Sequence, residues 1–345
     1  MTTRTALGSR DVGDSNGGIV AAAEGRKESM VSRLPAAVRF PLAVLVSFGL
    51  SATLRSLTAE LIGPELAAVS RDLTEGWQIG AMFAWKVAEL AIAWYACYDY
   101  VDLAYLSLLN NVPYYFLLNT FFGVDYLATA IPMVIDVTAL AIPFAFLRSL
   151  NYARRGGQVK NANQAVAQDR GVQYLIAAFG ASIYAIVVYG SFTTWLPTYM
   201  IVHFDGLRSL ERAHNTGILL LLALFGPLGY AATQFIFVPA IGSPGNPGIT
   251  DPALKPGKVA FDPQTATIGQ TVAWNLGLGE SGLTHRGEIL LKRTATLAAS
   301  SFISNFVRSY VIIEGTELLG ALGWASVWGS AAALVGLAYA WVGNE

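Results

Sequence analysis

The chain has 345 residues, of which 54% are hydrophobic and 13% are charged, and its formal net charge at pH 7 is −1. Soluble domains carry about 25% charged residues, so this composition is typical of a polytopic membrane protein. The nearly neutral charge gives no indication of nucleic-acid binding. The single cysteine, Cys97, excludes an internal disulfide and a cysteine-based metal cluster.

The first 38 residues are polar, rich in glycine and serine, and mixed in charge. This composition predicts a disordered tail over residues 1–38, followed by a transmembrane helical domain over residues 39–345. Glu24 and Glu28 argue against a mitochondrial presequence, and no short apolar segment of a cleaved signal lies near the N-terminus. We therefore expect the first membrane helix to act as an uncleaved anchor, which favours the endoplasmic reticulum or a membrane connected with it.

A helix of about 20 apolar residues spans a bilayer. Stretches of this kind lie at residues 41–62, 77–98, 101–121, 126–147, 172–194, 216–238, 295–313 and 318–342. The expected fold is all-α, a polytopic membrane helical bundle of about eight transmembrane helices. Arg55 and Glu60 interrupt the first stretch and Arg308 interrupts the seventh, so about seven helices remain if one of these stretches does not span the bilayer.

Lysine and arginine are distributed unevenly over the segments between these stretches. Segments 1–40, 148–170 and 240–293 hold sixteen of them, whereas the segments on the other side hold three, Arg71, Arg208 and Arg212. Cytoplasmic segments are enriched in bases, so both termini and the long loop at 241–290 are expected to be cytoplasmic. That loop is rich in proline and glycine, and we keep two interpretations of it, a flexible linker and an active-site lid.

Residues 77–147 are almost continuously apolar, and their charges are one base and five acids: Lys86, Glu89, Asp99, Asp102, Asp125 and Asp136. A carboxylate at the centre of a bilayer costs about 2.5–3.5 kcal/mol on insertion scales, so acids that persist there are usually paired or functional. Glu89 and Asp136 fall near the middle of their predicted helices, as do Asn110, Asn111 and Arg55. These residues are expected to cluster near the midplane if the first four helices pack together.

Two interpretations of this cluster remain open. In the structural one, Lys86–Glu89 and Arg55–Asp136 are ion pairs, and the asparagines link helices by hydrogen bonds. In the functional one, the excess of acids over bases leaves a carboxyl group neutral by desolvation, or turned towards a wet cavity. Glu89 or Asp136 is then the candidate catalytic acid, and Asn110 and Asn111 orient a substrate oxygen.

Further candidates for substrate contact lie beside these acids. Asp99 and Asp102 are three residues apart on one helical face; such a pair can hold Mg²⁺ for a diphosphate, although a solvated turn between two helices is the favoured interpretation. Three aromatic residues are expected nearer the midplane, within helical reach of Glu89: Trp85, Trp94 and Tyr105. Aromatic faces stabilise cations, so an acid with aromatic neighbours suits carbocation chemistry.

In chemical character, the helices over residues 77–147 resemble the fungal integral-membrane terpene cyclases of meroterpenoid biosynthesis. The resemblance rests on Glu89, Asp136 and their aromatic surroundings. It implies an isomerase or lyase of secondary-metabolite biosynthesis that protonates a prenyl or terpenoid chain and so starts its cyclisation. The implied partner is a lipophilic small-molecule substrate, with no cofactor and no metal. Two other functions stay open: a small transporter or channel that uses the same acids, and a membrane scaffold in which the acids are all paired.

Overall fold

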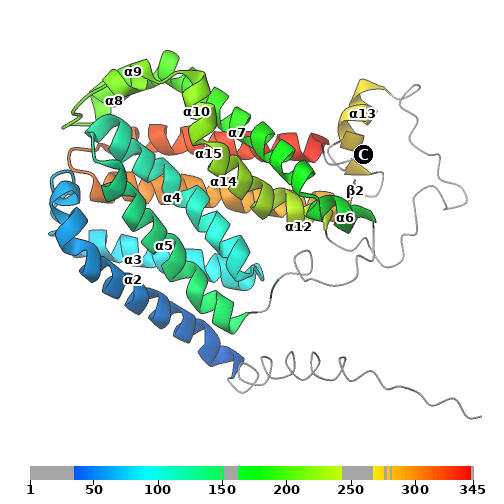
Figure 1. Ribbon diagram of the computed structural model, residues 1–345, viewed down its shortest axis with the longest axis horizontal. Helices are drawn as coiled ribbons and strands as arrows, with labels where there is room; N and C mark the ends of the chain where they lie inside the picture. Colours follow the sequence, from blue (N-terminus) through cyan, green and yellow to red (C-terminus); the bar gives the residue numbers. More distant parts are fainter. Residues whose placement is uncertain are drawn as a thin grey trace, which may run out of the picture.

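The computed structural model describes residues 35–148, 150, 162–242, 267–275, 278–279 and 282–342, and these residues are almost entirely helical (Figure 1). The predicted all-α class is confirmed. The longer helices are α2 (Ala36–Ala67), α3 (Gly76–Tyr95), α4 (Tyr100–Phe122), α5 (Tyr126–Leu147), α7 (Arg170–Thr193), α14 (His285–Ile312) and α15 (Leu318–Val342). The shorter ones are α6 (Ala162–Gln168), α8 (Leu196–His203), α9 (Glu211–Asn215), α10 (Ile218–Leu224), α11 (Gly226–Ala232), the π-helix η2 (Thr233–Phe237), α12 (Val238–Ile241) and α13 (Ile268–Asn275).

Parts of the predicted tail and loops lie outside the described residues. They are residues 1–34 of the tail, 149 and 151–161 of the basic segment, and 243–266, 276–277 and 280–281 of the long loop. Within the span predicted as that loop, the structure contains α13 and two short antiparallel strands, β1 (Leu278–Gly279) and β2 (Gly282–Leu283).

The predicted number of eight transmembrane helices is not confirmed. Every one of the predicted apolar stretches is largely helical, but in the described part of the chain four helices are long and apolar enough to cross a membrane: α2, α5, α7 and α15. A fifth candidate is the broken helix over 218–241, in which α10 meets α11–α12 at a bend of 51°. Of the two stretches that charges interrupt, the one at 41–62 lies within one of these candidates and the one at 295–313 does not; α3, α4 and α14 are not among the candidates.

The polar side chains of the interior explain this difference. α4 buries Asn110 and Asn111, and α14 buries Ser300 and Asn305 together with two arginines. A helix surrounded by other helices can direct polar groups at its neighbours, whereas a helix that faces lipid cannot. α2 carries four charged residues, Arg39, Arg55, Glu60 and Glu65, but it has few buried residues and lies at the edge of the bundle (Figure 1), where its apolar side chains can face lipid.

The long helices run between two ends of the bundle (Figure 1). At one end, which we call the basic end, the start of α2 meets the end of α3 through the Phe40 and Trp94 rings, and Arg148 after α5 donates to the Trp94 and Tyr98 carbonyls. α7 and α14 also start at this end, with Arg170 and Arg286, and α15 finishes there (Figure 1).

The opposite end, the acidic end, is closed by connections between distant loops. Arg71 N donates to the Ile312 carbonyl over 2.7 Å, and Asp205 N donates to the Gly315 carbonyl over 2.8 Å. His203 lies 2.7 Å from Glu317, which precedes α15. These contacts join the α2–α3 connection, the end of α8 and the α14–α15 connection into one surface.

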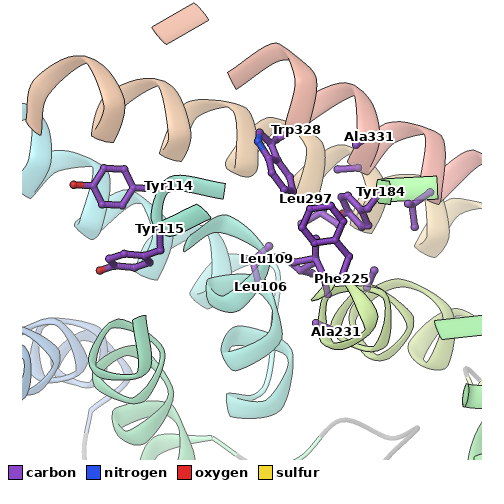
Figure 2. Packing of buried hydrophobic residues seen from close by; sticks show 14 of the residues in the cluster. Leu106, Leu109, Tyr114, Tyr115, Tyr184, Phe225, Ala231, Leu297, Trp328 and Ala331 are labelled. Carbon is purple, nitrogen blue, oxygen red and sulfur yellow. The ribbon is translucent and has the colours of Figure 1, made fainter. Parts of the chain in front are cut away.

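Aromatic rings fill the centre of the bundle. Phe116 of α4 lies 5.5 Å from Phe225, 5.9 Å from Trp328 and 6.1 Å from Phe192, measured between ring centroids. Figure 2 shows Phe225 and Trp328 converging with Tyr184 beside the leucines of α4. α4 is therefore the central helix, with neighbours on nearly all sides.

Small residues allow α7 and α11 to approach closely. A Cβ at Gly229 of α11 would lie 2.5 Å from the backbone nitrogen of Ala181 and would also clash with the Ala177 carbonyl, so the position requires glycine. The Tyr339 hydroxyl of α15 donates to the Ile176 carbonyl over 3.2 Å and so ties a third helix to this contact. Close approach through small residues is the usual way in which helices pack inside membranes.

Candidate functional site

Asp136 is the centre of a buried network of charges. It is the eleventh of the 22 residues of α5, and its side chain is 1% exposed. Arg55 of α2 donates to Oδ1 over 2.7 Å, and Arg308 of α14 donates to Oδ2 over 2.9 Å. The Tyr115 hydroxyl donates to Oδ2 over 3.0 Å, and Lys86 Nζ lies 3.9 Å from Oδ1. One carboxylate thus joins helices α2, α3, α4, α5 and α14.

Glu89 of α3 extends the network along α4. Lys86 Nζ lies 3.8 Å from Glu89 Oε2, and the Asn110 amide donates to Glu89 Oε1 over 3.0 Å. Ser300 of α14 donates in turn to Asn110 Oδ1 over 3.0 Å. Asn305 Nδ2 points at the Asn110 carbonyl over 3.5 Å. Buried polar groups are costly unless they are hydrogen-bonded. The relay satisfies Glu89 Oε1 and the Asn110 side chain, whereas Glu89 Oε2 and Lys86 Nζ have no hydrogen-bond partner among the described residues and contact each other as an ion pair.

A second buried ion pair lies nearer the basic end. Arg293 of α14 and Asp102 of α4 form a two-pronged pair, with both N–O distances at 2.9 Å. The same guanidinium donates to the Phe235 carbonyl over 2.7 Å and stacks over the Tyr98 and Phe235 rings. Phe235 belongs to η2, and π-helical turns often mark functional positions. Bidentate arginine–carboxylate pairs are the strongest ionic contacts in proteins, so this pair fixes α14 against α4.

The turn before α4 explains how Asp102 reaches this position. Asp99 caps α4, because its Oδ1 accepts from the Asp102 backbone nitrogen over 2.7 Å. Asp99 and Asp102 are both buried, so the favoured interpretation of a solvated turn is wrong. Among the described residues, no group of three or more His, Cys, Asp or Glu side chains is placed to hold a metal ion. Tyr98 lies in the same turn, and its hydroxyl donates to the Thr296 hydroxyl. Burial raises the pKa of the Tyr98 hydroxyl.

The structure brings together five of the residues selected from the sequence: Arg55, Lys86, Glu89, Asn110 and Asp136. The other candidates lie elsewhere.

Asn111 donates to Ser107 of its own helix, at 2.7 Å for the carbonyl and 3.0 Å for the hydroxyl. Trp94 packs under the Arg148 guanidinium at the basic end, and the Tyr105 ring contacts Tyr230. Trp85 is buried on α3, and its indole nitrogen has no hydrogen-bond partner in the described part of the chain. The candidate aromatic residues therefore do not form one cavity around Glu89.

The basic partners on α14 were missed by sequence reasoning. Arg308 was treated as an interruption of a membrane helix, and Arg293 lay outside the predicted span. A signal was present: the polar residues of this helix recur every three or four positions at Ser300, Ser301, Ser304, Asn305 and Arg308. A polar stripe on a membrane helix indicates a face turned towards other helices.

The profile of the Bouquet formation protein 3 C-terminal domain matches residues 169–342, half of the chain. The chain belongs to this family. No curated protein and no solved structure matches it. The family domain begins at Asp169, which caps α7, and ends with the last residue of α15.

The resemblance to terpene cyclases is wrong, and with it the predictions of acid-initiated cyclisation, of an isomerase or lyase and of meroterpenoid biosynthesis. The geometry gives a physical reason. A proton donor needs a neutral carboxyl group, whereas three basic groups surround Asp136 and stabilise it as an anion. No finding supports the lipophilic substrate or the endoplasmic reticulum, and the cytoplasmic position of both termini stays a prediction. The long apolar helices support association with a membrane.

Proposed function

We propose that this chain is an integral membrane protein of the nuclear envelope that serves as a scaffold in chromosome bouquet formation. The observation that carries the proposal is the family match over residues 169–342, because the family takes its name from bouquet formation. The apolar helices support a position within a membrane rather than beside one.

The buried network supports a scaffold rather than an enzyme. Asp136 and Asp102 each contact an arginine, and Glu89 contacts Lys86 and Asn110. We propose that these residues have a structural role, in which paired charges select one arrangement of the helices. In such a protein the interior supplies rigidity, and the surfaces outside the membrane bind protein partners.

Localisation and loss of function test this proposal together. A fluorescently tagged chain is expressed in the organism that carries the gene, and chromosome bouquets are scored in meiotic cells with and without the gene. We expect a signal at the nuclear rim, and a marked loss of bouquets that the tagged wild-type chain restores. A signal confined to other membranes, with normal bouquets in cells that lack the gene, would overturn the proposal.

A further inference from the structure

Residues 35–148, which we call the first half, lie outside the family match, yet they supply the helix at the centre of the family domain. α4 belongs to the first half and buries most of its length. Its Phe116 ring contacts Phe192, Phe225 and Trp328, and all three belong to residues 169–342. In Figure 2, Leu106 and Leu109 of α4 lie beside Phe225 and Leu297 of the family domain. Without α4, the aromatic rings at the centre of the family domain would lose the helix against which they pack.

The buried charges of the two halves are complementary. The first half contributes the carboxylates Asp102 and Asp136, and the family domain contributes the guanidinium groups of Arg293 and Arg308. Both arginine side chains are 7% exposed. Asn110 and Ser300 add a neutral hydrogen bond between the two pairs. An arginine left unpaired inside a membrane is expensive, so Arg293 and Arg308 of the family domain depend on carboxylates that the first half supplies.

Backbone contacts extend this interface to the acidic end. Arg71 N donates to the Ile312 carbonyl, and Glu314 N donates to the Val69 carbonyl over 3.2 Å. Arg208 N, from the family domain, donates to the Phe121 carbonyl at the end of α4 over 3.1 Å. The two halves therefore touch from Asp102 near the basic end to the loops of the acidic end.

We infer that the first half is the obligate partner of the family domain. The family domain takes α4 as its central helix and holds the first half through two ion pairs, Arg293 with Asp102 of α4 and Arg308 with Asp136 of α5. The two halves form one folding unit. This inference concerns the assembly of a single chain and does not rest on a role in bouquet formation.

A cut made after folding tests the inference in the full chain. A specific protease site is inserted between Leu150 and Ala162, and an affinity tag is placed at the C-terminus. The chain is cut in isolated membranes, extracted in mild detergent and purified through the tag. We expect the first half to be recovered with the family domain in equal amount. Two fragments that separate as soon as the chain is cut would overturn the inference.

Charge variants of the same cleavable chain test the role of the ion pairs. Asp102→Asn and Asp136→Asn together should lower the recovery of the first half by about tenfold, because they strand two buried guanidinium groups. The matched control is Asp125→Asn, which removes an exposed acid from the same helix as Asp136 and keeps a residue that can cap α5. An equal loss with the control would show that the pairs are not responsible.

If the chain with both Asp102→Asn and Asp136→Asn does not accumulate, a variant in which both members of the Asp102–Arg293 pair are neutral tests the same link. Asp102→Asn alone should reduce the amount of intact chain in the membrane, and adding Arg293→Gln in the family domain should restore most of it. The second change removes the stranded charge while leaving a side chain that can hydrogen-bond. Failure of Arg293→Gln to restore the level would overturn the assignment of this pair as a link between the halves.

Discussion

Asp136 contacts more buried bases than any other carboxylate in the described part of the chain. Asp136→Asn leaves the shape of the side chain almost unchanged, but it removes the carboxylate partner of Arg55 and Arg308 and leaves Lys86 with Glu89 alone. We expect the free energy of unfolding to fall by about 3–5 kcal/mol, as it does when one partner of a buried pair is removed. The amount of folded protein in membranes, measured by fluorescence-detected size exclusion, should fall accordingly.

The control for this prediction is again Asp125→Asn, whose membrane level should match that of the wild type. Asp125 caps α5 by accepting from the Leu127 nitrogen, and asparagine caps helices equally well. A normal level of Asp136→Asn would contradict the structural role of the network.

The two arginines that bind Asp136 should differ in importance. The side chain of Arg55 is 49% exposed and that of Arg308 is 7% exposed. Removing the exposed base leaves Asp136 paired with Arg308, whereas removing the buried base also leaves space beside the Tyr114 and Tyr115 rings. We expect Arg308→Gln to lower the melting temperature in detergent more than Arg55→Gln, and the reverse order would contradict this reading of burial.

At this scale, part of the site could be predicted from the sequence. Depth within a helix was enough to group Arg55, Glu89, Asn110 and Asp136. The pairing of Asp136 with Arg308 could not be predicted in the same way, because the partners lie 172 residues apart and no local spacing relates them. Tyr115 was overlooked because aromatic residues at membrane depth are usually lipid contacts.

At the scale of the helices, the close contact between α7 and α11 depends on glycine, which has no side chain, at position 229. Gly229→Ala would place a methyl group against Ala181 and the Ala177 carbonyl, so α11 would have to move. Overpacking of this kind costs about 1–3 kcal/mol. We expect a lower melting temperature in detergent for this variant.

Gly190→Ala on α7 is the matched control, since a Cβ there meets nothing within 4 Å. Its melting temperature should stay at the wild-type value or rise slightly, because alanine favours helix. Equal destabilisation by both variants would contradict the close approach of the two helices.

The positions of the helices could be predicted well from apolar stretches, but their surroundings could not. The sequence analysis predicted α4 as a membrane helix because it is long and most of its residues are apolar. It does not reveal that Asn110 and Asn111 face other helices rather than the bilayer. The break at Phe225 and the π-helical turn at Thr233–Phe237 were also missed, although Gly226 and Pro227 follow the break directly and are a typical signal of one.

For the molecule as a whole, the number of lysines and arginines near each end of the bundle predicts which side of the membrane that end faces. In the sequence, the helix ends at the basic end adjoin segments 1–40, 148–170 and 240–293, which hold sixteen lysines and arginines, whereas the opposite segments hold three. The excess of bases should place the basic end on the cytoplasmic or nucleoplasmic side. A glycosylation site inserted between Leu150 and Ala162 should stay unmodified, and one inserted beside Gly206 should be glycosylated. The opposite pattern would reverse the orientation.

The function could not be predicted from composition and spacing. Acids and aromatic residues at membrane depth fit catalysis and packing equally well, and the arginines that decide between them lie on a distant helix. The family match identified a different class of protein from the one that chemical character favoured.

The polar stripe of α14 has a consequence for how the chain is made. Translation proceeds from the N-terminus, so Asp102 and Asp136 enter the membrane well before Arg293 and Arg308 leave the ribosome. When the arginine-bearing helix arrives, its counter-charges are already in place. A circularly permuted chain that begins with the family domain would present those arginines first, and the membrane insertion machinery would have to hold them without partners.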